Sequence, residues 1–298
     1  MDDSLTLLVD APSLFYRALF STPDSITRPD GEPINAAYGF FRMLARLVAD
    51  LDPDYIACAS DDNWRPQWRV DLIPAYKNVR ATPGSQQEAA EARLATQVPI
   101  LYSFLEMCDI AVFGHPDYEA EDVIGTLVQR APGRVVIFSG DRDLFQLVRE
   151  ADVVVLFPIR GVSKLDIVDE AYIEKRYAIP GTAYRDFAIL RGDPSDGLPG
   201  VTGIGEKTAA SLVARYGDID AVLAAAERES ATTALRKVRR EADYVRRAVQ
   251  VVTIATDVDL DEGDATRPKD LPRDEIIAAA EAVGLKSPIT SLLDALTS

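Results

Sequence analysis

The chain has 298 residues, of which 47% are hydrophobic and 27% are charged, as in globular proteins that bury a sizeable core. No apolar run approaches the ~18–20 residues needed to cross a bilayer, and the acidic start "MDDSLTLLVD" leads directly into a strand pattern, so neither a membrane span nor a secretory signal is expected. A net charge of −16 argues against a nucleic-acid partner when taken over the whole chain, but net charge does not describe any single site.

Strand-like and helix-like segments alternate over the first two-thirds of the chain. Short apolar runs are typical of strands buried in a parallel sheet, and apolar residues spaced three or four apart predict helices that bury one face. The alternation predicts an α/β fold with a doubly wound parallel sheet. In chain order we expect a strand at 5–10, a helix at 35–51, a strand at 55–60, a helix at 86–108 with a break near Pro99, a helix from about 118, a strand at 134–138, a helix at 144–148 and a strand at 152–157.

The last third has a different pattern. It is almost entirely helical, apart from a Gly/Pro-rich stretch at 192–217, and we place a domain boundary near residue 180, which gives domains at 1–180 and 181–298. Residues 63–85 form a long connection rich in Arg, Trp and Pro, and long connections in compact domains are usually functional or mobile.

Cysteine and histidine are scarce, which limits the chemistry. Cys58 and Cys108 are interpreted as small core residues in a reducing cytoplasm. The single histidine, His115, is interpreted as a solvent-facing loop residue. Catalysis by a Ser–His or Cys–His pair, or a zinc site with several His or Cys ligands, is therefore not expected.

Carboxylates follow several of the predicted strands. Asp10 ends the first strand, Asp61 and Asp62 follow the second, and Asp141 and Asp143 follow the strand at 134–138. Ligands of open α/β sheets bind at the carboxyl ends of the strands, so these side chains are expected on one rim.

The stretch "PDYEAEDVIGTL" at 116–127 adds Asp117, Glu119, Glu121 and Asp122 just ahead of a helical run. Capping a helix explains one or two of them, at ~0.3–1 kcal/mol each. Carboxylates crowded on one rim need a cation, and oxygen ligands without histidine favour Mg²⁺ or Mn²⁺, with two ions ~3.5–4 Å apart as in phosphoryl displacement. Helix capping and a solvated acidic face remain the alternative.

Five stretches together resemble the 5′–3′ exonuclease and flap endonuclease family, which includes the N-terminal nuclease domain of bacterial DNA polymerase I: "VDAPSLFYRALF", "INAAYGFFRML", "YEAEDVIGTL", "FSGDRDLFQLV" and "LRGDPSDGLPGVTGIGEKTAASLV". The resemblance runs from about residue 5 to 260, and it suggests a stand-alone bacterial or phage-type member, because no polymerase domain follows. It implies a PIN-like catalytic domain with a helical arch at about 63–100, and a helix–three-turn–helix DNA-binding region in 181–298.

The resemblance also implies a two-metal site. It places Asp10, Asp62, Glu119 and Glu121 around one ion and Asp141, Asp143 and Asp196 around the other, with Asp122 and Asp193 in support. Asp62 is preferred to Asp61 by counting back from "RPQWR", and Glu121 stands where the family usually has Asp. The implied catalytic residues are Lys77, Arg80, Asp141 and Asp143.

DNA contacts are implied in two regions. In the connection, "YKNVR" resembles the arch motif: Tyr76 is expected to stack on an unpaired base, and Lys77 and Arg80 to hold the scissile phosphate, with Arg17, Arg65 and Arg69 adding phosphate contacts. Loop packing by the aromatic residues is the alternative. In "GVTGIGEKTA", Gly203, Gly205, Lys207 and Thr208 are expected to grip duplex backbone, with a K⁺ ion held by the backbone of Val201 and Ile204.

A basic run follows the glycine-rich stretch. Two interpretations are open for it: contact with DNA, which would reconcile a nucleic-acid partner with the acidic net charge, or a solvated helix face. Its members are Arg236, Lys237, Arg239, Arg240, Arg246 and Arg247.

The expected function is a structure-specific 5′ nuclease acting on DNA with 5′ flaps, nicks or gaps, with RNA-primed ends left open. We expect a monomer in the cytoplasm, associated with the nucleoid and not with a membrane. The rivals are a DNA-structure-binding protein with a degenerate site and a phosphatase with an Asp nucleophile. The second rival needs an Asp two residues after Asp10, where Pro12 stands.

Overall fold

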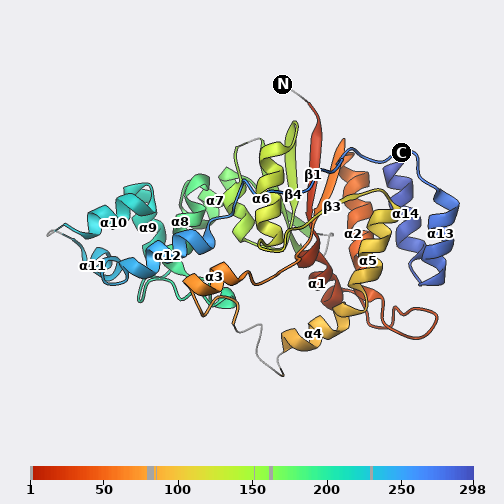
Figure 1. Cartoon of the computed structure of the whole chain (residues 1–298). Coiled ribbons are helices and arrows are strands. Elements are labelled where there is room, and N and C mark those ends of the chain that lie inside the picture. Colours follow the sequence, from red (N-terminus) through yellow and green to blue (C-terminus); the bar gives the residue numbers. More distant parts are fainter. Residues whose placement is uncertain (1–2, 79–83, 85, 151, 161–163, 229–230) are drawn as a thin grey trace.

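The computed structural model describes the chain except residues 1–2, 79–83, 85, 151, 161–163 and 229–230 (Figure 1). Arg80, expected to hold the scissile phosphate, lies outside the described residues. The strands are β1 (Leu5–Asp10), β2 (Tyr55–Ala59), β3 (Ala111–Phe113), β4 (Arg134–Phe138), β5 (Val153–Arg160) and β6 (Lys164–Val168). The α-helices are α1 (Ala11–Ser21), α2 (Asn35–Leu51), α3 (Gln67–Leu72), α4 (Gln86–Ala95), α5 (Val98–Met107), α6 (Ala120–Arg130), α7 (Glu170–Tyr177), α8 (Tyr184–Arg191), α9 (Glu206–Tyr216), α10 (Ile219–Ala226), α11 (Thr233–Arg240), α12 (Ala242–Val252), α13 (Arg273–Ala282) and α14 (Lys286–Leu296). No helix in the described part is long and apolar enough to span a bilayer.

The strands form one sheet in the order β3-β2-β1-β4-β5-β6. All pairs of neighbouring strands are parallel except β5 and β6, which are antiparallel. The predicted parallel sheet is therefore confirmed, with β6 as an additional antiparallel edge strand. Asp10 pairs with Ala59, and Val9 pairs with Phe138. The ends of β1, β2 and β4 are therefore level, and the segments that follow them start from the same rim.

Local signals explain the helix boundaries. The Asp10 carboxylate accepts a hydrogen bond from the Ser13 backbone N–H at 3.2 Å, so the residue that ends β1 also caps α1. The helix expected at 86–108 breaks into α4 and α5, and Pro99 occupies the first turn of α5, where its missing N–H costs nothing. The helix expected at 144–148 is instead a short 3₁₀ turn, Asp143–Leu147.

Helices cover both faces of the sheet (Figure 1). The core on one face joins α6 to the helical region α7–α12, and the core on the other face joins α1, α2 and α5 to α13 and α14. Ile276, Leu292 and Leu293, from α13 and α14, are fully buried there. The second domain proposed for 181–298 is therefore not one structural unit, because its last two helices return to the sheet and pack beside α2. The boundary at residue 180 itself stays a prediction.

A segment at 254–267, here called the strap, connects the helical region to α13. It runs over α6, where the Arg130 guanidinium donates to the Val258 carbonyl at 2.9 Å, and ends along β2, where the Ile56 N–H donates to the Ala265 carbonyl at 2.7 Å. At the other end, the Ala255 N–H donates to the Asp122 carboxylate at 2.8 Å. The strap thus connects one predicted metal ligand to the beginning of β2.

Gly125→Ala is expected to destabilise the protein, although alanine normally favours a helix over glycine by about 1 kcal/mol. A Cβ at this position of α6 would lie 2.4 Å from Ile254 Cγ2 and 2.5 Å from the Ala255 carbonyl oxygen, so the strap must move. We expect the free energy of unfolding in urea to fall by about 1–3 kcal/mol. A stability equal to or above that of the wild type would show that the strap is not packed on α6.

Candidate active site

Asp10 lies at the centre of the rim and is 5% exposed. Its carboxylate accepts hydrogen bonds from the Ser139 hydroxyl and the Ser13 N–H. Burial raises the pKa of Asp10 to about 7; Ser139 lowers it, whereas the nearby charges of Asp141 and Asp61 raise it further. The structure therefore brings the carboxylates after β1, β2 and β4 together, as the sequence predicts.

The turn after β4 places two further carboxylates on the rim. The Asp141 N–H donates to the Ser139 hydroxyl oxygen and the Asp143 N–H donates to the Asp141 carboxylate, each at 2.9 Å. Burial and the charge of Glu121 raise the pKa of Asp141 to about 6. Burial and the charge of Asp141 hold the pKa of Asp143 well above its usual value.

Glu119 and Asp122 do cap a helix, as the alternative interpretation proposed. Glu119 precedes α6, and the Asp122 carboxylate accepts its N–H at 3.2 Å in a capping box. Capping does not explain their burial, since Glu119 is 1% exposed and Asp122 is fully buried. Burial and the charge of Glu121 raise the pKa of Glu119 to about 8. Burial also raises the pKa of Asp122, to about 6.

Arg69 corrects one sequence-based expectation. Its side chain, expected to contact a DNA phosphate, is 0% exposed and lies beneath the carboxylates. The guanidinium pairs with Glu119 at 2.8 Å, Glu121 at 3.2 Å and Asp122 at 2.8 Å. Burial would lower the pKa of Arg69, but the three carboxylates hold it above its usual value. The assignment as a DNA contact is therefore wrong in this structure, and Arg69 is a buried counter-ion.

Tyr76 and Lys77 also point inward. Tyr76 is 2% exposed and its hydroxyl donates to Glu119 at 2.9 Å, so the ring is not available to stack on a base. The expected stacking role is thus wrong here, and the alternative of loop packing holds. The Lys77 ammonium pairs with Glu119 at 2.7 Å and is 5% exposed, which places a cation beside the carboxylates. Burial would lower the pKa of Lys77, but Tyr76 and Glu119 hold it well above its usual value.

The "GDPSD" segment reaches the rim through its backbone. The Lys77 N–H donates to the Asp196 carbonyl at 2.8 Å, and Asp196 is 6% exposed. Gly197 is required at this approach, because a Cβ would lie 1.9 Å from the Ala75 carbonyl oxygen and its φ is +69°. Asp193 is half-buried and caps the following 3₁₀ turn through the Ser195 N–H at 2.9 Å. The charge of Asp196 contributes to the raised pKa values of Asp141 and Asp143.

The residue after β2 that faces Asp10 is Asp61. Its carboxylate accepts the Ala120 N–H at 2.6 Å, and its charge acts on Asp10. Asp62 is exposed and accepts the Ser60 hydroxyl at 3.1 Å. The preference for Asp62 is therefore not supported, because counting residues does not determine which of two neighbours turns toward the rim.

The carboxylates suit a hard divalent ion by two observations. The Glu119 Oε1 atom is buried without a hydrogen-bond partner, a lone pair that an ion could satisfy. The rim also gathers acidic groups that raise one another's pKa values, which a cation would relieve. No three of the described carboxylate, imidazole or thiol groups converge on a common point, and Arg69 and Lys77 pair with the carboxylates at the start of α6.

The remaining arginines near the rim differ. Arg17 is half-buried beside the turn before Asp141, because a Cβ on Gly140 would lie 2.9 Å from its guanidinium. Burial lowers the pKa of Arg17. The Arg65 guanidinium donates to the Tyr76 carbonyl at 2.7 Å and so braces the connection, which leaves less of it for a phosphate. His115 is half-buried against Tyr118 rather than fully solvent-facing.

The glycine-rich turn precedes α9 in the helical region. Gly203, Gly205 and Lys207 are exposed and Thr208 is half-buried, so the first turn of α9 presents its N–H groups to solvent. The Val201 carbonyl, one proposed K⁺ ligand, accepts the Ile204 N–H at 2.9 Å.

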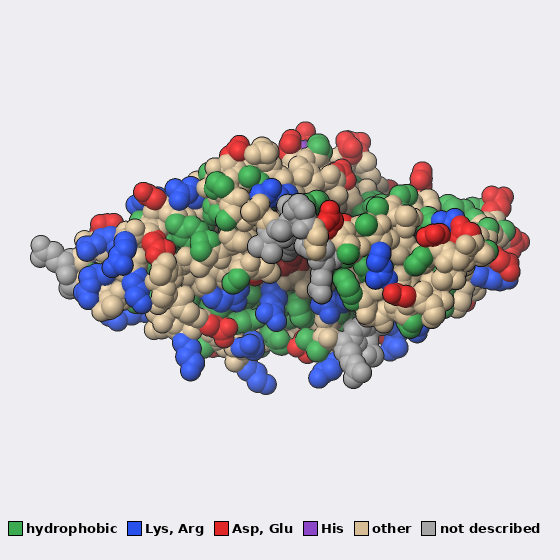
Figure 2. Space-filling model, turned by 90° about the horizontal axis from the view of Figure 1, so that it is seen from below, with side chains coloured by type: hydrophobic (Ala, Val, Ile, Leu, Met, Phe, Trp, Pro, Cys, Tyr) green, Lys and Arg blue, Asp and Glu red, His purple; other side chains and the backbone are tan. Residues whose placement is uncertain are grey.

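The basic run of α11 and α12 lies next to this turn. The Lys237 ammonium donates to the Gly203 carbonyl at 2.8 Å, and Glu241 accepts the Thr202 N–H at 3.2 Å. Arg239, Arg240 and Arg247 are exposed. In Figure 2, Lys and Arg side chains gather at the end of the molecule formed by these helices and continue along one edge of that face. The contact between Lys237 and the Gly203 carbonyl was not predicted from the sequence, although the length of the basic run was a signal for it.

Two family models cover nearly the whole chain. Residues 5–178 match the model described as 5′-3′ exonuclease, N-terminal resolvase-like domain, and residues 179–274 match the model described as 5′-3′ exonuclease, C-terminal SAM fold.

Relatives agree with the models. A 5′-3′ exonuclease of Streptomyces coelicolor is 45% identical, with 98% of this chain and 100% of the relative covered. DNA polymerase I of Mycobacterium tuberculosis is 41% identical over 72% of this chain and 23% of its own length. The fold is similar to that of the bacteriophage T5 D15 flap endonuclease, solved with DNA and metal ions, with a TM-score of 0.69, 14% identity, and 98% and 99% of the two chains covered. The chain belongs to the 5′–3′ exonuclease family.

Proposed function

We propose that this protein hydrolyses phosphodiester bonds near the 5′ end of DNA that carries a flap, nick or gap, with Mg²⁺ or Mn²⁺ as cofactor. The observation that carries the proposal is the set of buried and half-buried carboxylates that share one rim. Burial and mutual repulsion raise the pKa values of Asp10, Glu119 and Asp141 to about 7, 8 and 6, an arrangement that lowers stability unless a cation is bound.

The rim residues divide into two groups. Asp10, Asp61, Glu119 and Glu121 would hold one ion, and Asp141, Asp143 and Asp196 the other, with Asp122 and Asp193 in support; Asp62 stays a candidate beside Asp61. When bound, such ions supply a hydroxide nucleophile and stabilise the leaving oxyanion. Lys77 lies 2.7 Å from Glu119 and would shift from this carboxylate to the scissile phosphate.

The helical region would hold the duplex. The exposed N–H groups of α9, with Gly203, Gly205, Lys207 and Thr208, suit a backbone phosphate, and the arginines of α11 and α12 extend the positive surface. A K⁺ ion at the carbonyls of this turn belongs to the same proposal. Arg17, and Arg80 outside the described residues, would add contacts near the rim. This concentration of positive charge reconciles DNA binding with a net charge of −16.

The relatives support the choice of substrate. The T5 neighbour is solved with DNA and metal ions, and another neighbour is the catalytic core of Rad2 with DNA substrate. The likeness to DNA polymerase I favours replication and repair, and hence a location in the cytoplasm with the nucleoid. We propose a monomer, because the large exposed hydrophobic residues of the described part, Phe20, Val112, Ile159 and Ile167, are few and spread over several elements.

The test is cleavage of a duplex with a labelled 5′ flap, compared with blunt duplex and with the same flap made of RNA. We expect cleavage near the junction in Mg²⁺ or Mn²⁺, none in EDTA, and full recovery on adding the ion back. The protein should still bind the flap DNA in EDTA, and its affinity for the DNA should fall steeply as the salt concentration rises. Full activity in EDTA, or equal cleavage of blunt duplex interior bonds, would contradict the proposal.

A further inference from the structure

Two adjoining cavities lie beside the β3 edge of the sheet. One has a volume of about 430 Å³ and the other about 630 Å³, and both are within the size range of ligand pockets. They share Phe113 of β3 and the strap residues Asp261, Glu262 and Gly263. We call the two cavities together the edge groove.

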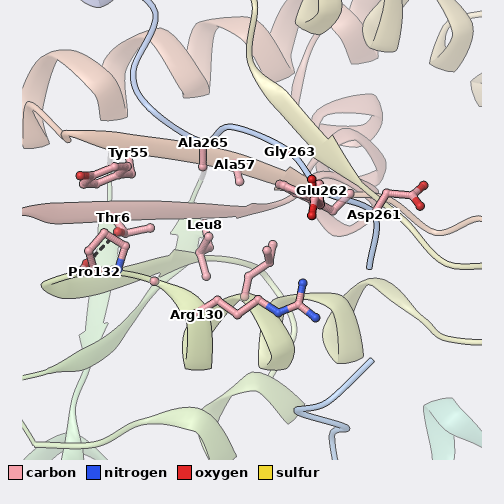
Figure 3. Close-up of a pocket in the computed structure, with 13 residues that line it drawn as sticks. Thr6, Leu8, Tyr55, Ala57, Arg130, Pro132, Asp261, Glu262, Gly263 and Ala265 are labelled. Carbon is pink, nitrogen blue, oxygen red and sulfur yellow. Dashed lines mark hydrogen bonds between the residues drawn. The ribbon is translucent and has the colours of Figure 1, made fainter. Parts of the chain in front are cut away.

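The smaller cavity has an apolar floor. Leu8 and Ala57 come from β1 and β2, Leu127 comes from α6, and Figure 3 shows the two strand residues between Tyr55 and Arg130. The Arg130 guanidinium is engaged by the Val258 carbonyl at 2.9 Å. The cavity therefore offers hydrophobic contact to a side chain that enters beneath the strap.

The larger cavity is strongly acidic. It is lined by Asp61, Asp62, Glu106, Asp109, Asp261, Glu262 and Asp264, and no Lys or Arg is among the described residues that line it. Such a surface repels DNA, and a second copy of a chain with a net charge of −16 is also disfavoured. The charge is complementary to a cationic partner.

The shape favours an extended ligand over a single ion. No three of the described acidic residues converge on a common point, so the charges are spread along the groove. All of β3 lines the larger cavity, and β3 is the edge strand of the sheet. Val112 in its middle is 37% exposed. A sheet edge is a template for an added strand, with side-chain pockets giving specificity.

We propose that the edge groove docks an extended, Lys/Arg-rich segment of another protein, which lies along β3 with an apolar side chain in the smaller cavity. The proposal does not depend on the cleavage reaction. Asp61 and Asp62 also belong to the proposed metal site, so the test changes Glu106, Glu262 and Ala131, which lie outside the catalytic set. Failure of this proposal and failure of the proposed function are therefore distinguishable.

The probe is a capped, fluorescein-labelled peptide Lys-Leu-Lys-Val-Lys-Leu-Lys, with binding followed by fluorescence anisotropy in low salt. Glu106→Lys/Glu262→Lys is expected to raise Kd by about tenfold or more, because like charges would face the peptide. Glu227→Lys/Asp270→Lys, at exposed positions elsewhere, alters net charge equally and should leave Kd within about twofold. Ala131→Trp, which fills the smaller cavity, should raise Kd by about fivefold.

Three results would overturn the proposal. They are a peptide that does not bind, equal weakening by both double variants, and binding of a seven-lysine peptide as tight as that of the probe. The last two results would mean that the peptide is held by long-range attraction to an acidic protein and does not dock in the edge groove. Flap cleavage by Glu106→Lys/Glu262→Lys should match that of the wild type, which verifies that the variant is folded.

Discussion

Asp143→Asn is expected to abolish cleavage while making the metal-free protein more stable. The substitution keeps the shape of the side chain and removes one charge from the rim. Loss of a carboxylate that would hold a catalytic ion should lower kcat by about 10³-fold or more, by analogy with the loss of other strong electrostatic contributions to a transition state.

The gain in stability follows from the raised pKa of the same group. Burial and the charges of Asp141 and Glu121 hold the pKa of Asp143 well above its usual value, so ionised Asp143 destabilises the fold at neutral pH. Neutralising it should raise the free energy of unfolding in EDTA by about 1–2 kcal/mol at pH 8. At pH 4, where the wild-type carboxyl is already protonated, the gain should vanish.

The measurements are single-turnover cleavage of a 5′ flap, DNA binding without metal, and urea unfolding in EDTA. Asp270→Asn, at an exposed position, is the matched control and should change none of them. A variant that cleaves at more than a tenth of the wild-type rate would remove Asp143 from the catalytic set. A variant that is less stable at pH 8 would mean that the Asp143 charge is compensated in the metal-free protein.

The sequence predicts the frame of the fold because the buried strands are continuous apolar runs. "LTLLVD", "YIACAS" and "RVVIF" correspond to β1, β2 and β4 within a residue or two. β3 is too short to show a pattern, and in the edge strand β6 ("KLDIV") polarity does not follow burial, since Ile167 is 60% exposed while Asp166 is half-buried. The return of α13 to the sheet was also missed, since an amphipathic helix does not specify the surface on which it packs.

The acidic residues of the candidate site and Lys77 were predictable, whereas the position of Arg69 was not. Carboxylates at strand ends share a rim by topology alone, which is why Asp10 and Asp141 were found. Arg69 carries no such signal, because an arginine in a polar connection is usually exposed. Its burial depends on how residues 63–78 fold back under α6, and that is a tertiary property.

Arg69→Met is expected to destabilise the metal-free protein by about 3–5 kcal/mol at pH 8, because it leaves two buried carboxylates and the half-buried Glu121 with only Lys77 to balance them. Methionine has a side chain of similar length, so the loss of stability reflects the missing charge more than the missing volume. Arg46→Met, which breaks an exposed pair with Asp50 on α2, is the control and should cost less than about 1 kcal/mol.

The stability lost in Arg69→Met should depend on pH, and the raised pKa values of Glu119 and Asp122 give the direction of that dependence. Folding raises the pKa of Glu119 from 4.5 to about 8 and that of Asp122 from 3.8 to about 6. The folded state therefore binds protons more tightly than the unfolded state, and these groups contribute stability that is present below pH 4 and lost as the pH rises through 6 to 8. Because Arg69 lowers both pKa values, its removal should steepen that loss, with a smaller deficit at pH 5 than at pH 8.

Divalent ions distinguish a counter-ion from a DNA contact. A cation that binds the freed carboxylates of Arg69→Met stabilises only the folded state, so millimolar Mg²⁺ should recover part of the deficit, about 2–3 kcal/mol at a hundredfold excess over Kd. Thermal and urea unfolding with Mg²⁺ or EDTA measure this directly. Unchanged stability in EDTA together with weaker DNA binding would contradict the buried position and restore Arg69 to the DNA interface. Lost stability that Mg²⁺ does not recover would mean that Arg69 holds the connection in place without sharing its carboxylates with an ion.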